Sequence, residues 1–483
     1  MQLDASFLSR RAFLKKNGCA ALGLIGVTNM LAQLRMVHNA SAQVGANDYK
    51  ALVCVFLYGG NDANNTILPT GPQYAPYNDD RGALAIEENL INPFSFTDAL
   101  GRVHGMHPNL NDGHLTSPSL YSLFESGQCA VVGNVGTLVQ PVEQEGYFDR
   151  TVQLPPQLFS HQDQQRHWQS SVPDQPFASG WGGRLADRMF DNNVGAKTSM
   201  SVSIAGHNDF MVGNELAATQ LHLTSNGPIA LQNYGNPINP SADSNNGRLI
   251  RGFDKIMDES MSNLFAEEYR ERVATARRNN ALIADSIKTL SLPADYPDFP
   301  THNLGRQLEM VSKMIAIRSS LNQKRQLFFV AIGGYDTHAD QLAGHADRMS
   351  ELSGALGAFY QSTVSLGVAN DVTSFTCSDF NRTYSPNTND GSDHAWGGHA
   401  MVVGGSVKGK EIYGLMPDLV LGGVEDTELV TANRTSRGRW IPSTSVDEYA
   451  ATLAKWYGIP PAELGMVFPN INRFATPDLG FML

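Results

Sequence analysis

The chain has 483 residues, of which 42% are hydrophobic and 17% are charged, with 35 Lys and Arg against 47 Asp and Glu. This much apolar content excludes a wholly disordered chain, and a net charge of −12 argues against a nucleic-acid-binding surface, which needs a basic footprint. Four Cys in a chain of this length exclude a disulfide-framework protein.

Residues 1–42 have the layout of an export signal. Arg10 and Arg11 stand side by side, an apolar run covers residues 19–31, and Ala40-Ser41-Ala42 is a small-x-small cleavage site. This order predicts a Tat signal peptide, although an ordinary amphipathic first helix is the alternative. We expect a periplasmic or extracellular mature protein with no membrane span once the leader is removed. Cleavage after Ala42 would leave 30 basic and 46 acidic residues, a net charge of −16.

Short apolar runs in the rest of the chain predict buried strands. They cover residues 51–58, 128–133, 200–205, 326–332, 372–378 and 400–404, and helical patterns at 248–290, 304–322, 345–367 and 445–457 lie between or after them. Continuous apolar strands that alternate with helices are typical of a mostly parallel sheet sandwiched by helices, so we expect an α/β fold. Stretches rich in Asn, Gly and Pro at 58–80, 222–247 and 381–399 predict long loops. Because no linker stands out, residues 43–483 are expected to form a single domain.

Three of the predicted strands run directly into an acidic residue. The strand at 51–58 leads to Asp62, the strand at 326–332 leads to Asp336 and His338, and the strand at 372–378 leads to Asp379. Ligands of open α/β sheets bind beyond the carboxyl ends of strands, and Asp and His together suit zinc, manganese or iron. Residues 391–399 add an acid and two histidines, including His394, in a Gly-rich loop. Taken singly, each residue has a structural explanation as a cap, a turn residue or an ion-pair partner, but the repeated pattern favours a metal site.

Ser160 precedes a helical stretch that ends near Ser171. A hydroxyl at a helix N-terminus gains from the helix dipole, so Ser160 is a candidate nucleophile. The alternative is a simple N-cap, in which Asp163 completes a capping box.

With these residues in hand, the sequence resembles the domain of unknown function 1501 family, within the alkaline phosphatase/sulfatase superfamily. The resemblance spans nearly the whole mature chain. The matching motifs are Gly59-Gly60-Asn61-Asp62, Gly105-Met106-His107-Pro108, Val132-Gly133-Asn134-Val135-Gly136, Ser160-His161, Tyr335-Asp336-Thr337-His338, Ser378-Asp379-Phe380-Asn381-Arg382-Thr383, Asp393-His394-Ala395-Trp396-Gly397, Ile441-Pro442-Ser443-Thr444 and Val467-Phe468-Pro469-Asn470.

The resemblance implies an alkaline phosphatase-like fold and one or two divalent ions, zinc or manganese, around a serine nucleophile. Carried over by chain order, one ion would be held by Asp62, Ser160 and Asp379, and the other by Asp336, His338 and His394. Arg382 would hold an oxyanion of the substrate.

The sequence departs from that pattern in one place. Many superfamily members follow the third strand with Asp-His, whereas Phe380 follows Asp379 here. The second ion is then weak, absent or completed by another residue, such as His161 or His399. The formylglycine signature of sulfatases is also missing, because Ser171-Val172-Pro173-Asp174-Gln175 lacks its arginine.

Three classes of function stay open from the sequence. The first is an exported metal-dependent hydrolase that uses Ser160 on an anionic phosphate or sulfate ester, either a small molecule or a glycan. The second is a non-catalytic protein of the same fold that binds an anionic ligand or glycan. The third, a redox enzyme, is suggested only by Tat export, since the chain has no Gly-x-Gly-x-x-Gly or Cys-x-x-Cys motif.

Overall fold

The computed structural model describes residues 49–214, 219–229, 244–259, 263–432 and 435–483. The predicted signal peptide, residues 1–42, lies outside these ranges. Residues Lys50–Leu483 form one compact unit. Within the described ranges, none of the helices combines the length and the apolar character needed to cross a bilayer.

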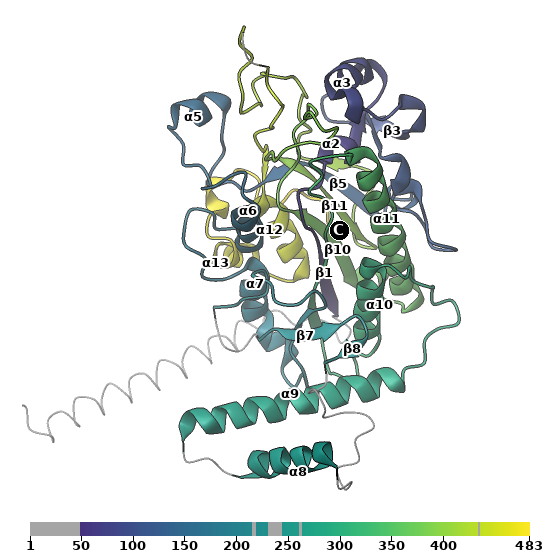
Figure 1. Ribbon diagram of the computed structural model, residues 1–483, viewed down its shortest axis with the longest axis vertical. Coiled ribbons are helices and arrows are strands. Elements are labelled where there is room, and N and C mark those ends of the chain that lie inside the picture. Colours follow the sequence, from purple (N-terminus) through teal and green to yellow (C-terminus); the bar gives the residue numbers. More distant parts are fainter. Residues whose placement is uncertain (1–48, 215–218, 230–243, 260–262, 433–434) are drawn as a thin grey trace, which may run out of the picture. The chain divides into compact units, whose positions relative to one another are not determined.

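Ten strands of the described chain form one sheet, in the order β12-β5-β11-β10-β1-β9-β6-β7-β8, with β13 paired to β5 off this path (Figure 1). Strands β1, β9, β10, β6 and β7 are mutually parallel, whereas β11 runs antiparallel to both β10 and β5. All six predicted strands are present, which confirms the α/β class with a mostly parallel sheet. The bounds are β1 (Lys50–Leu57), β5 (Cys129–Gly136), β6 (Ser201–Ser203), β7 (Leu221–Thr224), β8 (Gly227–Pro228), β9 (Arg325–Ile332), β10 (Val372–Ser378), β11 (Gly398–Gly404), β12 (Ile412–Tyr413) and β13 (Thr444–Ser445).

Helices cover both faces of this sheet. In Figure 1, α10 and α11 lie on one side of β1 and β10, and α7, α12 and α13 lie on the other. This double cover explains the unbroken apolar run of β1, in which every residue from Ala51 to Leu57 is buried. The bounds are α2 (Ala63–Thr66), α3 (Tyr74–Arg81), α4 (Leu120–Glu125), α5 (Gln144–Asp149), α6 (His161–Ser170), α7 (Trp181–Met189), α8 (Asn245–Asp258), α9 (Leu264–Lys288), α10 (Asn303–Ala316), α11 (Gln341–Ser365), α12 (Val446–Tyr457) and α13 (Leu464–Val467).

Helix α12 begins where its sequence predicts. The Ser445 hydroxyl accepts a hydrogen bond from the Glu448 backbone N–H at 3.0 Å, and the Glu448 carboxylate accepts one from the Ser445 N–H at 3.0 Å. This capping box satisfies backbone donors that the first turn of a helix leaves without partners.

The stretch predicted as a loop at 58–80 contains regular structure. It holds α2, most of α3 and the strand β2 (Ile67–Pro69), which joins β4 (Val103–Met106) and β3 (Asn92–Thr97) in a small antiparallel sheet. The Asn, Gly and Pro content of this segment reflects the short spacing of its elements rather than one long loop. The helical pattern at 248–290 likewise corresponds to two helices, α8 and α9.

The strand directions bring four segments to one edge of the sheet. Strands β1, β9 and β10 are parallel neighbours, so the residues that follow them emerge at the same edge. Because β11 runs antiparallel to β10, β11 begins at the edge where β10 ends, and the loop before it, which contains His394, lies at that edge too.

Candidate metal centre

The cluster at this edge is centred on Asp336. Its Oδ1 lies 3.0 Å from His338 Nε2, 3.4 Å from His161 Nε2 and 3.4 Å from His394 Nε2. The Nε2 atoms of His338 and His394 are themselves 3.1 Å apart. The ligand atoms of His161, Asp336 and His394 all lie within 4.8 Å of one another. Four side chains from three separate parts of the chain therefore turn their ligand atoms toward one place.

Each of the three histidines binds an acceptor through its other ring nitrogen. His161 Nδ1 lies 2.6 Å from an Asp379 carboxylate oxygen, His338 Nδ1 lies 3.2 Å from Asp393 Oδ1, and His394 Nδ1 lies 2.7 Å from the Phe159 carbonyl oxygen. Carbonyl and carboxylate oxygens accept hydrogen bonds, so the proton of each neutral ring belongs on Nδ1. Each Nε2 then carries a lone pair that faces the cluster.

Lone pairs gathered in this way repel one another unless a cation lies among them. The buried Nε2 of His161 has no hydrogen-bond partner, although Asp336 is close by. A tetrahedral ion with bonds of about 2.0–2.1 Å keeps its ligand atoms about 3.3 Å apart, which matches the 3.0–3.4 Å separations around Asp336. Histidines with Nδ1 fixed by an acceptor are typical of metal sites. The residues therefore fit a divalent ion bound by Asp336 and these histidines.

The surroundings of Asp336 and His394 favour an ionised carboxylate and a neutral imidazole, which are the protonation states that bind a metal ion. Burial alone raises the pKa of Asp336, but the hydrogen bond and charge of Arg382 outweigh it, so the pKa lies below its usual range. Burial lowers the pKa of His394, which favours the neutral ring. In contrast, the hydrogen bond to Asp379 raises the pKa of His161 above its usual value.

Asp379 is fully buried and acts on the cluster through His161. One of its oxygens accepts a hydrogen bond from the Gly59 N–H at 3.2 Å, and the other accepts from Gln165 Nε2 at 2.8 Å and bonds to His161. Helix α6 supplies both His161 and Gln165, so Asp379 fixes this helix and the His161 ring together.

Asp62, the residue predicted to share an ion with Asp379, has different neighbours. Its carboxylate forms an ion pair with Arg81 and accepts a hydrogen bond from Gln341 Nε2, while its Oδ1 also accepts from the Asn64 N–H at 3.2 Å. The side chains of Asp62 and Arg81 are both 0% exposed. The structure thus brings together Asp336, His338, His394 and, through His161, Asp379, whereas Asp62 lies in a separate ion pair.

Ser160 occupies the N-cap position of α6, but its side chain does not cap the helix. The Ser160 hydroxyl instead donates to Asp163 Oδ2 at 2.6 Å. Both of its neighbours in sequence contact the cluster. The Phe159 carbonyl oxygen accepts a hydrogen bond from His394 Nδ1, and His161 contributes its Nε2 atom.

Arg382 and Phe380 contact the side chains of the cluster without being candidate ligands. The fully buried Arg382 guanidinium donates to Asp336 Oδ1 at 2.8 Å and also to the carbonyl of Ser392. The ring of Phe380 packs against those of His394 and His161, with centroids 4.5 Å and 4.7 Å apart. Phe380 therefore takes part in the site as a packing surface for two histidines.

Comparison with known protein families identifies the chain. The model of the family described as "Protein of unknown function (DUF1501)" matches residues 49–432. The chain belongs to this family. A search of curated proteins gave no match. The family that the sequence motifs indicated is thereby confirmed.

Solved structures similar to this DUF1501 chain are sulfatases and an alkaline phosphatase. A PsFucS1 sulfatase from Pseudoalteromonas sp. is 8% identical, with 89% of this chain and 71% of that chain covered and a TM-score of 0.34. A 2-O GAG sulfatase is 8% identical, with 86% and 72% covered and a TM-score of 0.29. A mutant of the alkaline phosphatase PafA is 9% identical, with 70% and 64% covered and a TM-score of 0.26. Likenesses at this level do not bear on the activity of the chain.

Several contacts of the DUF1501 site had no clear signal in the sequence. His161 was only one of two suggested replacements for a missing ligand, and the other, His399, accepts a hydrogen bond from the Asn134 N–H at 3.1 Å. Burial lowers the pKa of His399 to about 3. The partnership of Arg81 with Asp62 could not be read from the sequence, because Arg81 lies in a segment predicted to follow a loop.

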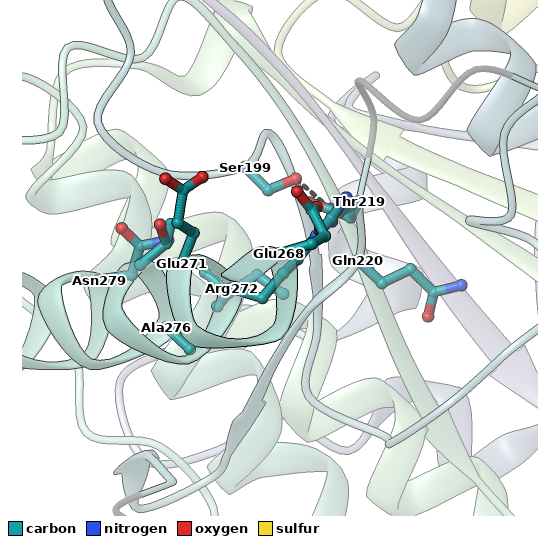
Figure 2. Close-up of a pocket in the computed structure, with 10 residues that line it drawn as sticks. Ser199, Thr219, Gln220, Glu268, Glu271, Arg272, Ala276 and Asn279 are labelled. Carbon is teal, nitrogen blue, oxygen red and sulfur yellow. Dashed lines mark hydrogen bonds and ion pairs between the residues drawn. The ribbon is translucent and has the colours of Figure 1, made fainter. Parts of the chain in front are cut away.

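A cavity of about 410 Å³ lies away from the metal cluster, between α9 and the segments around β6 and β7 (Figure 2). Glu268, Glu271 and Arg272 of α9 line it, and Glu268 and Arg272 are ion-paired at 2.7 Å. None of the predicted site residues lines this cavity, so the metal cluster remains the candidate site.

Proposed function

We propose that the chain is an exported metal-dependent hydrolase of phosphate or sulfate esters that uses Ser160 as its nucleophile. The observation that carries this proposal is the convergence of three Nε2 atoms and one carboxylate at the carboxyl edge of the sheet, each ring held by an acceptor on Nδ1. Zinc and manganese are the ions that suit these ligands.

The residues of the chain divide the work as follows. Asp336, His338, His394 and His161 hold the ion, which when bound acts as a Lewis acid on an ester oxygen. Ser160 would form a bond to the phosphorus or sulfur atom as the bond to the ester oxygen breaks, and Asp163, 2.6 Å from the hydroxyl, would accept the Ser160 proton. The ester oxygen would leave as the alcohol after taking a proton from water, and a second water molecule would then hydrolyse the serine ester and restore Ser160. Arg382, whose guanidinium is buried against Asp336, holds that carboxylate in place rather than meeting the substrate oxyanion.

Two features favour a second candidate, a non-catalytic protein that binds an anionic ligand or glycan at the same ion. Phe380 stands where many superfamily members have a ligand histidine, and Asp62 is neutralised by Arg81. A site with one ion can hold an anion without completing the machinery for its hydrolysis.

Metal analysis followed by an activity panel tests the proposal. Full-length protein purified from the periplasm is expected to carry a zinc or manganese ion that Asp336→Ala removes. A panel of aryl phosphate monoesters, diesters and sulfates is then assayed with wild type and Ser160→Ala. Metal near zero in wild type would overturn the metalloenzyme, and turnover of no ester by a metal-loaded protein would favour the binding function.

A further inference from the structure

The residues expected to hold a second ion are already satisfied within the protein. Both oxygens of Asp62 have partners: Asn64 N–H on one, and Arg81 with Gln341 on the other. Both oxygens of Asp379 also have partners, namely Gly59 N–H on one, and Gln165 with His161 on the other. Binding an ion at either carboxylate would break buried hydrogen bonds that the fold has already formed.

Arg81 is held in place by more than Asp62. Its Nη1 donates to the carbonyl oxygens of Thr383 and Tyr384 at 3.1 Å and 2.6 Å, and its guanidinium carbon lies 5.7 Å from the centre of the Tyr384 ring. The guanidinium is therefore a fixed positive charge at full burial. It supplies to Asp62 the compensation that a buried carboxylate needs and that a metal ion would otherwise provide.

Phe380 closes the remaining space. Phe380 is 3% exposed, and a Cβ placed on Gly60 would lie 2.5 Å from two carbons of its ring. The cavity beneath the ring, lined by Asn61, Ser378, Phe380 and His399, has a volume of only about 20 Å³, enough for about one water molecule. The ring also provides no ligand atom, whereas an ion bound there would need several.

We propose that the chain binds one divalent ion, at the cluster of Asp336, His161, His338 and His394, and that the Arg81 guanidinium takes the position of a second cation by neutralising Asp62. This inference rests on the proposed function for the identity of the first site. It goes further by assigning Asp62 and Asp379 structural partners within the protein instead of a second metal.

Metal stoichiometry in matched variants tests the inference without an activity assay. Full-length wild type is loaded with excess zinc, freed of unbound ion and measured by elemental analysis, with affinity from competition against a chelator. We expect one ion per chain in wild type, near zero in His394→Ala, and one in Asp62→Asn with affinity within about twofold of wild type. Because Asp62→Asn leaves Arg81 buried without its counter-charge, its melting temperature is expected to fall.

The double variant Asp62→Asn/Arg81→Met keeps the test informative if Asp62→Asn alone does not fold. Removing both charges should restore part of the lost melting temperature and leave the stoichiometry at one. Two ions in wild type, with one lost in Asp62→Asn, would overturn the single-ion inference and leave the hydrolase proposal standing. No ion in folded wild type would overturn the hydrolase proposal itself. A single ion that is lost in Asp62→Asn but kept in His394→Ala would be bound at Asp62 instead of at the histidine cluster, and would overturn the inference.

Discussion

The Nε2 atoms of His338 and His394 lie 3.1 Å apart, and each ring is bound on its opposite side by a fixed acceptor. Asp393 holds His338, and the carbonyl of Phe159 holds His394. A divalent ion beside these two facing nitrogen atoms would accept a lone pair from each, and the Asp336 carboxylate would be a further ligand of that ion.

Asp393 is expected to tune metal affinity without binding the metal. Asp393→Asn weakens the hold on His338 Nδ1 and removes the ion pair with Arg437 at 2.9 Å, so metal affinity should fall by about 10–100-fold. Asp390→Asn is the matched control, because Asp390 is an exposed residue of the same loop. Chelator competition measures both. Equal affinities for the two variants would show that Asp393 does not orient His338.

Ser160→Ala should lower the rate of ester hydrolysis by about 1,000-fold or more, because the variant lacks the hydroxyl proposed as the nucleophile. Asp163→Asn should lower the rate by about 100-fold or more, since Asp163 receives the proton of Ser160. Gln162→Ala, an exposed neighbour on α6, serves as the control and should hydrolyse the ester at the wild-type rate. Hydrolysis that survives Ser160→Ala at full rate would remove Ser160 from the mechanism.

Two glycine substitutions should change stability in opposite directions. Gly60 has φ +84° and sits against the Phe380 ring, so Gly60→Ala should cost about 1–3 kcal/mol and disturb the histidines that pack on that ring. Gly344 lies within α11 with open space around it, so Gly344→Ala should raise stability by about 0.5–1 kcal/mol. Chemical denaturation measures both free energies of unfolding. A Gly60→Ala variant as stable as wild type would show that the ring can move aside.

Asp447 should make stability depend on pH. Burial raises its pKa to about 7, and its Oδ1 has no hydrogen-bond partner. The folded state then keeps a proton that the unfolded state releases above pH of about 4, so this contribution to stability is fully present below about pH 4 and is lost as pH rises through 7.

The isosteric variant Asp447→Asn isolates this effect. Its stability relative to wild type should increase between pH 4 and pH 7, by about 1.4 kcal/mol for each unit of pKa shift, and then level off. Denaturation across that range measures the difference. A difference that stays constant from pH 4 to pH 8 would contradict a raised pKa for Asp447.

Much of the fold is determined by local patterns in the sequence. The apolar runs that became β1, β9 and β10 are long and continuous because helices cover both faces of the sheet. The capping box of α12 can be read directly, since Ser445 and Glu448 interact across one turn. The order of strands and acids along the chain also placed Asp336, His338 and His394 in one predicted site.

Only the tertiary structure decided which partner each of these residues has. Asp62 and Asp379 follow their strands in the same way as Asp336. Asp62, however, is paired with Arg81, 19 residues further on, and Asp379 is paired with His161, 218 residues away. A carboxylate is a metal ligand or an ion-pair partner according to which charges the fold brings within a few ångströms, and sequence spacing does not contain that distance. The sequence by itself thus determined the edge of the sheet where the chemistry lies, and the packing of α3 and α6 against it decided which of its acids remain open to an ion.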